Sequence, residues 1–190
     1  MAKFLSIKKI LPIFFQKTKK ELESWKRKIS KEYKISMPSN SFLLKIYHFL
    51  LKEGRIKRNL ALEKILKKRP IRSLSGVVNI SVLTKPYPCP GECIFCPQEK
   101  GLPKSYLSNE PAVERAKKLS FSPKKQVEKR IRDLENCGHN TEKIELRIIG
   151  GTFSYYPKKY QRYFVQKAFE GANQKISKNL KDAQKTNEKA

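Results

Sequence analysis

Three cysteines in one short loop sequence constrain the fold of this chain more than any other feature. Cys89, Cys93 and Cys96 have the spacing C-x3-C-x2-C, with prolines and a glycine around them and Phe95 directly before the last cysteine. A cubane iron–sulfur cluster in the usual ferredoxin arrangement is bound by four thiolates. Three close thiolates bind three irons and leave the fourth open to a small molecule. The motif is therefore compatible with an enzyme as well as with an electron carrier.

Zinc is the competing metal for such a motif. A structural zinc site needs four ligands, usually arranged as two pairs, whereas His48 and His139 stand in other segments. Cys137 is a fourth ligand only if the fold brings it close, and its position beside a helix end indicates a buried thiol instead. Neighbouring cysteines at this spacing are also poorly placed to form disulfides. The pattern favours an iron–sulfur cluster over zinc and over unligated thiols.

The net charge of +26 at pH 7 is the strongest compositional signal. Residues 1–72 hold 21 Lys and Arg against 5 Asp and Glu, a net charge of +16, so the surplus is densest ahead of the cysteines. Such a field attracts polyanions, either a nucleic acid or an anionic membrane surface. The size and localisation of the surplus favour nucleic acid over a merely solvated basic face.

The first residues contain apolar side chains, but Lys8, Lys9 and Pro12 interrupt them. Neither the apolar core of a secretory signal nor a membrane span fits this pattern. Clustered thiols without a secretory signal are typical of a reducing compartment. We expect a cytoplasmic protein with no membrane partner.

Residues 1–68 predict three or four short basic helices, because apolar residues recur at helical spacing between the basic clusters. The apolar stripes are Ile7, Ile10, Leu11, Phe14 and Phe15; then Phe42, Leu43, Tyr47, Leu50 and Leu51; then Leu60, Leu62, Ile65 and Leu66. A linker is expected at 68–72, because Pro70 disfavours helix in the residue before it.

From residue 77 onward the pattern changes to that of a parallel α/β protein. Residues 77–83 and 143–149 are β-branched and apolar and predict buried strands. Helices are expected at 111–118, 123–136 and 159–173, so the cysteine loop follows the first strand and Gly150-Gly-Thr152 follows the second. We therefore expect an α/β fold: a basic helical region over 1–72, and over 73–190 the first β/α units of an incomplete, TIM-like barrel.

A C-x3-C-x-aromatic-C motif after the first strand resembles the radical S-adenosylmethionine superfamily. The resemblance implies that Cys89, Cys93 and Cys96 bind a [4Fe–4S] cluster whose open iron binds S-adenosylmethionine. It also implies that the glycine-rich segment Gly150, Gly151 and Thr152 contacts the methionine amino group, and that Phe95 packs near the adenine or else lines the core. One electron then cleaves a carbon–sulfur bond and gives a 5′-deoxyadenosyl radical.

Five segments in a fixed order give a more specific resemblance, to the Elongator catalytic subunit family. They are Pro70-Ile-Arg-Ser-Leu-Ser-Gly-Val77, Leu83-Thr-Lys-Pro-Tyr-Pro-Cys-Pro-Gly91, Pro103-Lys-Ser-Tyr-Leu-Ser-Asn-Glu-Pro111, Gly138-His-Asn-Thr-Glu-Lys143 and Ile148-Ile-Gly-Gly-Thr-Phe153. The resemblance implies a tRNA uridine(34) acetyltransferase-type enzyme, which forms 5-carboxymethyluridine at the wobble position from acetyl-CoA and S-adenosylmethionine.

Individual residues inherit expected roles from this resemblance. Lys143 matches a lysine that contacts acetyl-CoA in the family, although from physics alone it reads as a solvated residue opening a strand. Tyr106 and Glu110 lie in a matching segment without a settled role. The basic region 1–72 corresponds to the tRNA-binding segment, where Trp25 or Tyr33 stacks on bases or, more simply, packs in the helical core.

The family's barrel continues for several more strands and an acetyltransferase domain, neither of which is present here. We expect a fragment or one part of a split gene, requiring a second chain for the rest of the barrel and the acetyltransferase domain. An inactive tRNA- or RNA-binding module and a different radical S-adenosylmethionine enzyme remain as alternatives.

Overall fold

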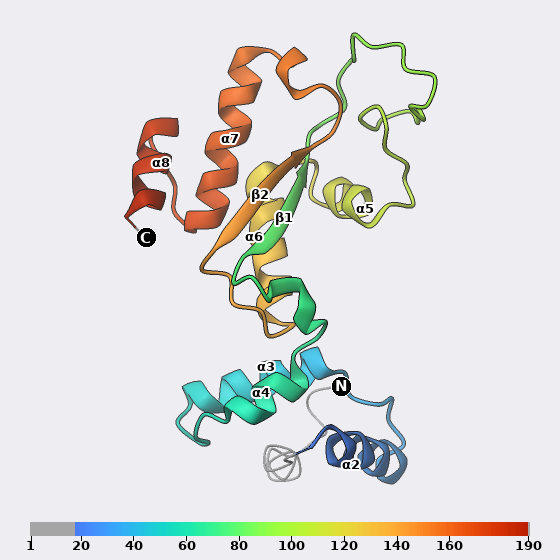
Figure 1. Ribbon diagram of the computed structural model, residues 1–190, viewed down its shortest axis with the longest axis vertical. Helices are drawn as coiled ribbons and strands as arrows, with labels where there is room; N and C mark the ends of the chain where they lie inside the picture. The colour runs from blue at the N-terminus through green and yellow to red at the C-terminus, as the bar shows by residue number, and fades with distance from the viewer. Residues whose placement is uncertain (1–17, 190) are drawn as a thin grey trace. The chain divides into compact units, whose positions relative to one another are not determined.

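The computed structural model describes residues 18–189, and it divides the chain into two compact units. The first unit comprises Met1–Gly76 and Asp133–Thr141, and the second comprises Val77–Arg132 and Glu142–Ala190. Together they form a mixed helix and strand structure with one small parallel sheet (Figure 1). The expected mixed α/β content is therefore confirmed, while the partial barrel stays a prediction. None of the helices in residues 18–189 combines the length and the apolarity that crossing a membrane requires.

Three helices with matching caps build the first unit. They are α2 (Lys19–Glu32), α3 (Asn40–Lys52) and α4 (Leu60–Leu66), and the side chains of Thr18, Ser39 and Asn59 cap their N-termini. Each cap oxygen accepts a hydrogen bond from a backbone amide that has no partner inside the helix. α3 and α4 contain the second and third predicted stripes, whereas α2 contains none of them, and the stripe predicted at Ile7–Phe15 lies outside the described residues.

The core of this unit is a leucine cluster around one tyrosine. The fully buried side chains are those of Leu22, Leu43, Leu44, Tyr47, Leu50, Leu62 and Leu66. The Tyr47 hydroxyl accepts a hydrogen bond from the Asn59 amide at 2.6 Å, which ties α3 to the start of α4. Trp25 is partly buried and packs against this cluster, which agrees with the prediction that it packs in the helical core.

The segment after α4 is attached to the turn at 133–141. The expected linker contains a short 3-10 turn, η2 (Pro70–Ser73), preceded by Arg69 in the left-handed region. The Lys68 amide donates to the Cys137 carbonyl at 2.9 Å, and Ser73 Oγ lies 2.8 Å from Nδ1 of the buried His139. The linker is therefore fixed to this unit.

The second unit is built on two parallel strands. β1 (Val78–Leu83) pairs with β2 (Ile144–Ile149) in the register Val78 to Ile144 and Leu83 to Ile149. The end of β1 is also bonded to α6 (Pro123–Glu135), because the Gln126 side chain donates to the Leu83 carbonyl at 2.9 Å and accepts from the Leu83 amide at 3.0 Å. One amide side chain thus satisfies both backbone groups of a buried strand residue.

The remaining helices are α5 (Pro111–Lys118), α7 (Lys158–Asn173) and α8 (Leu180–Glu188), with a short 3-10 turn, η3 (Phe153–Tyr155), before α7. Among them, α5 packs against β1, and α8 packs against α7 (Figure 1). Gly171 allows α7 to approach α6 closely, since a Cβ there would lie 2.7 Å from the Lys124 carbonyl oxygen. The bounds of both strands and of α5, α6 and α7 agree with the sequence prediction to within a residue, whereas α8 was not predicted.

Candidate metal centre

The parallel pairing brings the segments after β1 and β2 together at one end of the sheet. The Thr84 amide donates to the Ile149 carbonyl at 2.9 Å, so Thr84 lies beside Gly150. A Cβ on Gly150 would lie 2.0 Å from Thr84 Oγ1, and its φ of +146° is one that other residues rarely adopt. Glycine is therefore required here by both space and backbone conformation.

This junction places the first cysteine beside the glycine-rich segment. Cys89 Sγ lies 3.4 Å from the Thr152 hydroxyl, although the two residues are 63 positions apart in sequence. The hydrogen bond with the Thr152 side chain, with a smaller contribution from the Gly91 backbone, holds the pKa of the Cys89 thiol below its ordinary value. A lower pKa favours the thiolate, which is the form that binds metals.

The second cysteine lies close to the first, on either side of Gly91. A Cβ on Gly91 would lie 3.5 Å from Cys93 Sγ and 3.8 Å from Cys89 Sγ. Both sulfurs therefore face the space that the missing side chain leaves open. The Lys104 ammonium donates to the Gly91 carbonyl, which holds this part of the loop from the other side.

The third cysteine is held in a turn. The Cys96 amide donates to the Cys93 carbonyl at 3.2 Å, and Cys96 Sγ lies 2.9 Å from Ser105 Oγ. Ile94 and Phe95 project from this turn and are 88% and 91% exposed. The exposure of Phe95 rules out the core role that was one of its two interpretations, and the contact with adenine stays a prediction.

A cavity of about 380 Å³ opens beside the first two cysteines. Its lining includes Tyr87, Cys89, Gly91, Glu99 and Lys104. Glu99 accepts a hydrogen bond from the Ser108 amide at 2.8 Å, and that bond lowers the pKa of its carboxyl group. Glu92 also lines the cavity. A cavity with a cysteine, two carboxylates and an ammonium group suits a small polar molecule with charges of both signs.

The three cysteines have the donor chemistry of an iron–sulfur site. All are free thiols, and each is half-buried or exposed. Within residues 18–189, no three Cys, His, Asp or Glu side chains are gathered closely enough to hold a single metal ion. Thiolates are the ligand type that iron–sulfur clusters use, and the cluster itself stays a prediction.

Lys143 lies away from the cysteine loop. It precedes β2, whereas Gly150 follows it, so about seven extended residues, roughly 20 Å, separate the two positions. Its side chain is exposed, and its carbonyl accepts a hydrogen bond from the Val78 amide at 3.0 Å. The role of Lys143 in acetyl-CoA binding stays a prediction. If Lys143 contacts acetyl-CoA, the contacted part of that ligand lies far from Thr152.

Tyr106 and Glu110 have structural contacts. Tyr106 packs on the apolar cluster of Leu83 and Val113 and hydrogen-bonds to the Gly150 backbone. Glu110 occupies the N-cap position of α5, as expected, but its carboxylate accepts from the preceding Leu107 amide at 2.9 Å. Tyr106 thus supports the glycine-rich segment directly.

An aromatic ladder that the sequence did not predict holds the start of the cysteine loop. The rings of Tyr87 and Tyr156 stack at 4.8 Å, and those of Tyr156 and Tyr160 at 4.9 Å. The Tyr156 hydroxyl donates to the Lys85 carbonyl at 2.7 Å, and the Lys85 amide donates to the Tyr160 hydroxyl at 3.0 Å. Burial raises the pKa of Tyr160 to about 12, so this phenol stays neutral at physiological pH. The only local signal was the density of aromatics at 153–164.

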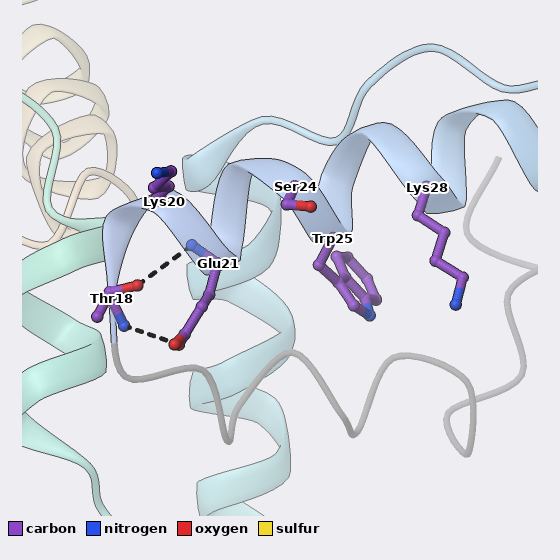
Figure 2. Close-up of a pocket in the computed structure, with 6 residues that line it drawn as sticks. All are labelled: Thr18, Lys20, Glu21, Ser24, Trp25 and Lys28. Carbon is purple, nitrogen blue, oxygen red and sulfur yellow. Dashed lines mark hydrogen bonds between the residues drawn. The ribbon is translucent and has the colours of Figure 1, made fainter.

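A second cavity, of about 520 Å³, lies along α2 in the first unit (Figure 2). Thr18 and Glu21 line one end of it and form the reciprocal capping hydrogen bonds of that helix, both at 3.2 Å. Trp25 and two lysines, Lys20 and Lys28, complete the described lining together with Ser24. Trp25 and Lys28 project from one side of α2 and Lys20 from the other (Figure 2). An indole with an ammonium group on the same side of the helix suits a phosphate-bearing, stackable ligand.

Comparison with known proteins gives similarities over most of the chain. It is 41% identical over 180 residues to tRNA uridine(34) acetyltransferase of Methanocaldococcus infernus, which covers 90% of this chain and 32% of that protein. The chain is 32% identical over 139 residues to Elongator complex protein 3 of Homo sapiens, which covers 66% of this chain and 25% of that protein. The chain is a homologue of the Elongator catalytic subunits. No family model matches it.

The chain spans about a third of the length of the curated relatives that it matches over the longest stretch. A solved structure of the archaeal Elp3 of Methanocaldococcus infernus with an N-terminal deletion is also similar, with a TM-score of 0.45 and 32% identity. That similarity covers 60% of this chain and 20% of the other. The sequence identities to these relatives confirm the suspected relationship to the Elongator catalytic subunits, at the level of this region.

Proposed function

We propose that this chain carries the cluster-binding region of a tRNA uridine(34) acetyltransferase-type radical S-adenosylmethionine enzyme. The complete activity would form 5-carboxymethyluridine at the wobble position of tRNA from acetyl-CoA and S-adenosylmethionine. The supporting observation is the 3.4 Å approach of Cys89 Sγ to Thr152, which joins the cysteine loop to the glycine-rich segment. Relatives named for tRNA uridine(34) acetylation support the substrate class.

In this proposal Cys89, Cys93 and Cys96 hold a [4Fe–4S] cluster, which when bound supplies one electron for the cleavage of S-adenosylmethionine. Gly150 and Gly151 carry no side chains, so the methionine part could approach the backbone closely at this segment; Tyr106 already hydrogen-bonds to the Gly150 backbone. The exposed ring of Phe95 is free to pack against the adenine. The ammonium group of Lys104 faces the same cavity and would favour a carboxylate.

The first unit would bind the tRNA. Its three described helices have buried apolar faces, which leave most of their lysines and arginines on the surface; Lys26 of α2 is buried. Such side chains contact phosphates without reading sequence and give an affinity that falls with salt. The rest of the barrel and the acetyltransferase domain would come from sequence outside this chain, on the same or a second polypeptide.

Anaerobic reconstitution with iron and sulfide tests the cluster. We expect about four irons per chain and a thiolate-to-iron charge-transfer absorbance. Replacing Cys89, Cys93 or Cys96 by serine should abolish both. Cys137→Ser is the matched control. Cys137 belongs to the first unit, where its Sγ lies 3.7 Å from Ser41 Oγ, whereas the cysteine loop belongs to the second unit. This variant should leave iron binding unchanged.

Two results would contradict the proposal. One is a wild-type chain that binds a single zinc ion and no iron. The other is iron uptake that falls equally in the Cys137→Ser variant, since that would place the ligands outside the motif. Tight, salt-sensitive tRNA binding by a chain that takes up no iron would instead support the alternative of an RNA-binding module.

A further inference from the structure

Ser105 has a backbone conformation that non-glycine residues seldom adopt. Its φ is +77°, in the left-handed region. Its amide donates to the Pro97 carbonyl at 3.1 Å, directly after Cys96 in the sequence. Strained residues of this kind persist only where the surroundings hold them, and they cluster at functional sites.

The residues around Ser105 hold it firmly. Leu102 is buried in the cluster of Leu83, Val113 and Ala116, and Tyr106 packs on the same cluster. Lys104 donates to the Gly91 carbonyl, between the first two cysteines. The segment 102–106 is therefore anchored on both sides of Ser105 and contacts both halves of the cysteine loop.

The strained backbone presents the serine hydroxyl to a cysteine sulfur. Ser105 Oγ lies 2.9 Å from Cys96 Sγ. Between a hydroxyl and a thiol either atom can donate the hydrogen bond. A thiolate that binds iron has no proton, so the serine must then donate.

We propose that Ser105 is a positioning residue for the cysteine loop, whose hydroxyl donates a hydrogen bond to the Cys96 sulfur and thereby favours the reduced state of the cluster. This inference rests on the proposed function. Reduction adds negative charge, part of which lies on the ligand sulfurs. A donor on such a sulfur stabilises the reduced form more than the oxidised form.

The reduction potential of the reconstituted full chain, measured by redox titration monitored by electron paramagnetic resonance, tests the inference. Ser105→Ala removes the hydroxyl and keeps the strain, whereas Ser105→Gly removes both. We expect both variants to assemble the cluster. The equilibrium constant for its reduction should be about tenfold smaller than in wild type, which for a one-electron couple is a shift of about 59 mV to lower potential.

Ser120 gives a matched control. It is also a serine in the left-handed region, with φ of +51°, and it lies at the end of α5. Ser120→Gly should leave the potential unchanged. If replacing any serine in the left-handed region changed the potential, the Ser105 and Ser120 variants would both show the shift.

The outcomes separate the inference from the proposed function. If the wild-type chain assembles no iron–sulfur cluster, the proposed function and this inference both fail. If the cluster assembles and the potential of both Ser105 variants equals that of wild type, the inference alone fails. A shift in Ser105→Gly that is absent in Ser105→Ala would assign the effect to backbone strain and would also overturn it.

Discussion

Replacing Gly150 by alanine should disrupt the end of the sheet on which the proposed site depends. The added Cβ would lie 2.0 Å from Thr84 Oγ1 and 3.2 Å from Thr84 Cβ. Thr84 has little freedom to move, because it is buried and its hydroxyl lies 2.9 Å from that of Tyr156. The backbone φ of +146° adds strain for any side chain.

The magnitude follows from these two terms. Overpacking in a well-packed site costs about 1–3 kcal/mol, and an unfavourable positive φ adds about 1–2 kcal/mol. The smaller entropy of the unfolded alanine variant offsets at most about 1 kcal/mol of this. We therefore expect the second unit to lose about 2–4 kcal/mol of stability.

Gly151→Ala is the matched control, because a Cβ there would meet no atom within 4 Å. It should be neutral or stabilising by up to about 1 kcal/mol. The assay is native-state hydrogen exchange of the amides in Val78–Leu83 and Ile144–Ile149, which reports opening of this sheet locally. The single tryptophan, Trp25, lies in the first unit, and its fluorescence should report unchanged unfolding there.

We expect exchange in the two strands of Gly150→Ala to be at least about tenfold faster than in Gly151→Ala, since 1.4 kcal/mol corresponds to a factor of ten. Equal exchange rates in the two variants would refute the reasoning. They would mean that Thr84 moves aside freely and that the sheet end is not the fixed point from which the cysteine loop begins.

Three further predictions concern other parts of the chain. Burial alone would raise the pKa of Glu170, but hydrogen bonds from Lys167 and Ser177 hold it at about 2. Because the folded pKa is depressed, the ionised carboxylate stabilises the fold above pH 4.5, and this stabilisation is lost as the pH falls toward 2. In urea unfolding, wild type should therefore lose about 2 kcal/mol more stability than Glu170→Gln between pH 7 and pH 3. Gln126→Leu leaves the Leu83 amide and carbonyl without their side-chain partner, so it should lower the free energy of unfolding by about 2–4 kcal/mol in urea unfolding. As a control, Gln184→Leu on the exposed face of α8 should lower it by less than about 0.5 kcal/mol. Replacing both Lys20 and Lys28 by alanine should reduce the salt dependence of tRNA binding by about one to two phosphate contacts, and an unchanged slope would place the contact surface elsewhere.

The elements of the second unit were predictable because their signals are local. Both strands are short β-branched runs that a glycine or proline ends, and α5 begins with Pro111 at its first position. The cysteine motif and the glycine-rich segment were also visible, because spacing and residue type mark them in the sequence. The adjacency of Cys89 and Thr152 then follows from parallel pairing, which brings the carboxyl ends of both strands to one edge.

The supports of the site were not predictable, because they depend on contacts between distant residues. Tyr156 reaches Lys85 across 71 positions, and nothing in either neighbourhood marks that pairing. Glu170 is a charged residue on a predicted amphipathic helix, yet it is fully buried because the turn before α8 supplies Ser177 as a donor. Ser105 has no local signature, since serine is not a residue that normally indicates a left-handed backbone.

The two ends of the cysteine loop are consequently held by different means. Cys89 is fixed by the sheet, because Thr84 and Gly150 are in contact and the Tyr156 hydroxyl holds Lys85. Cys96 follows Cys93 and the two exposed residues Ile94 and Phe95, and its side chain is held by Ser105. Changes at the sheet end should therefore lower stability and cluster assembly together, because the fold and the first ligand share the same contacts. Changes at Ser105 should alter the potential while the strands keep their protection from exchange, since no strand residue depends on that hydroxyl for a described contact.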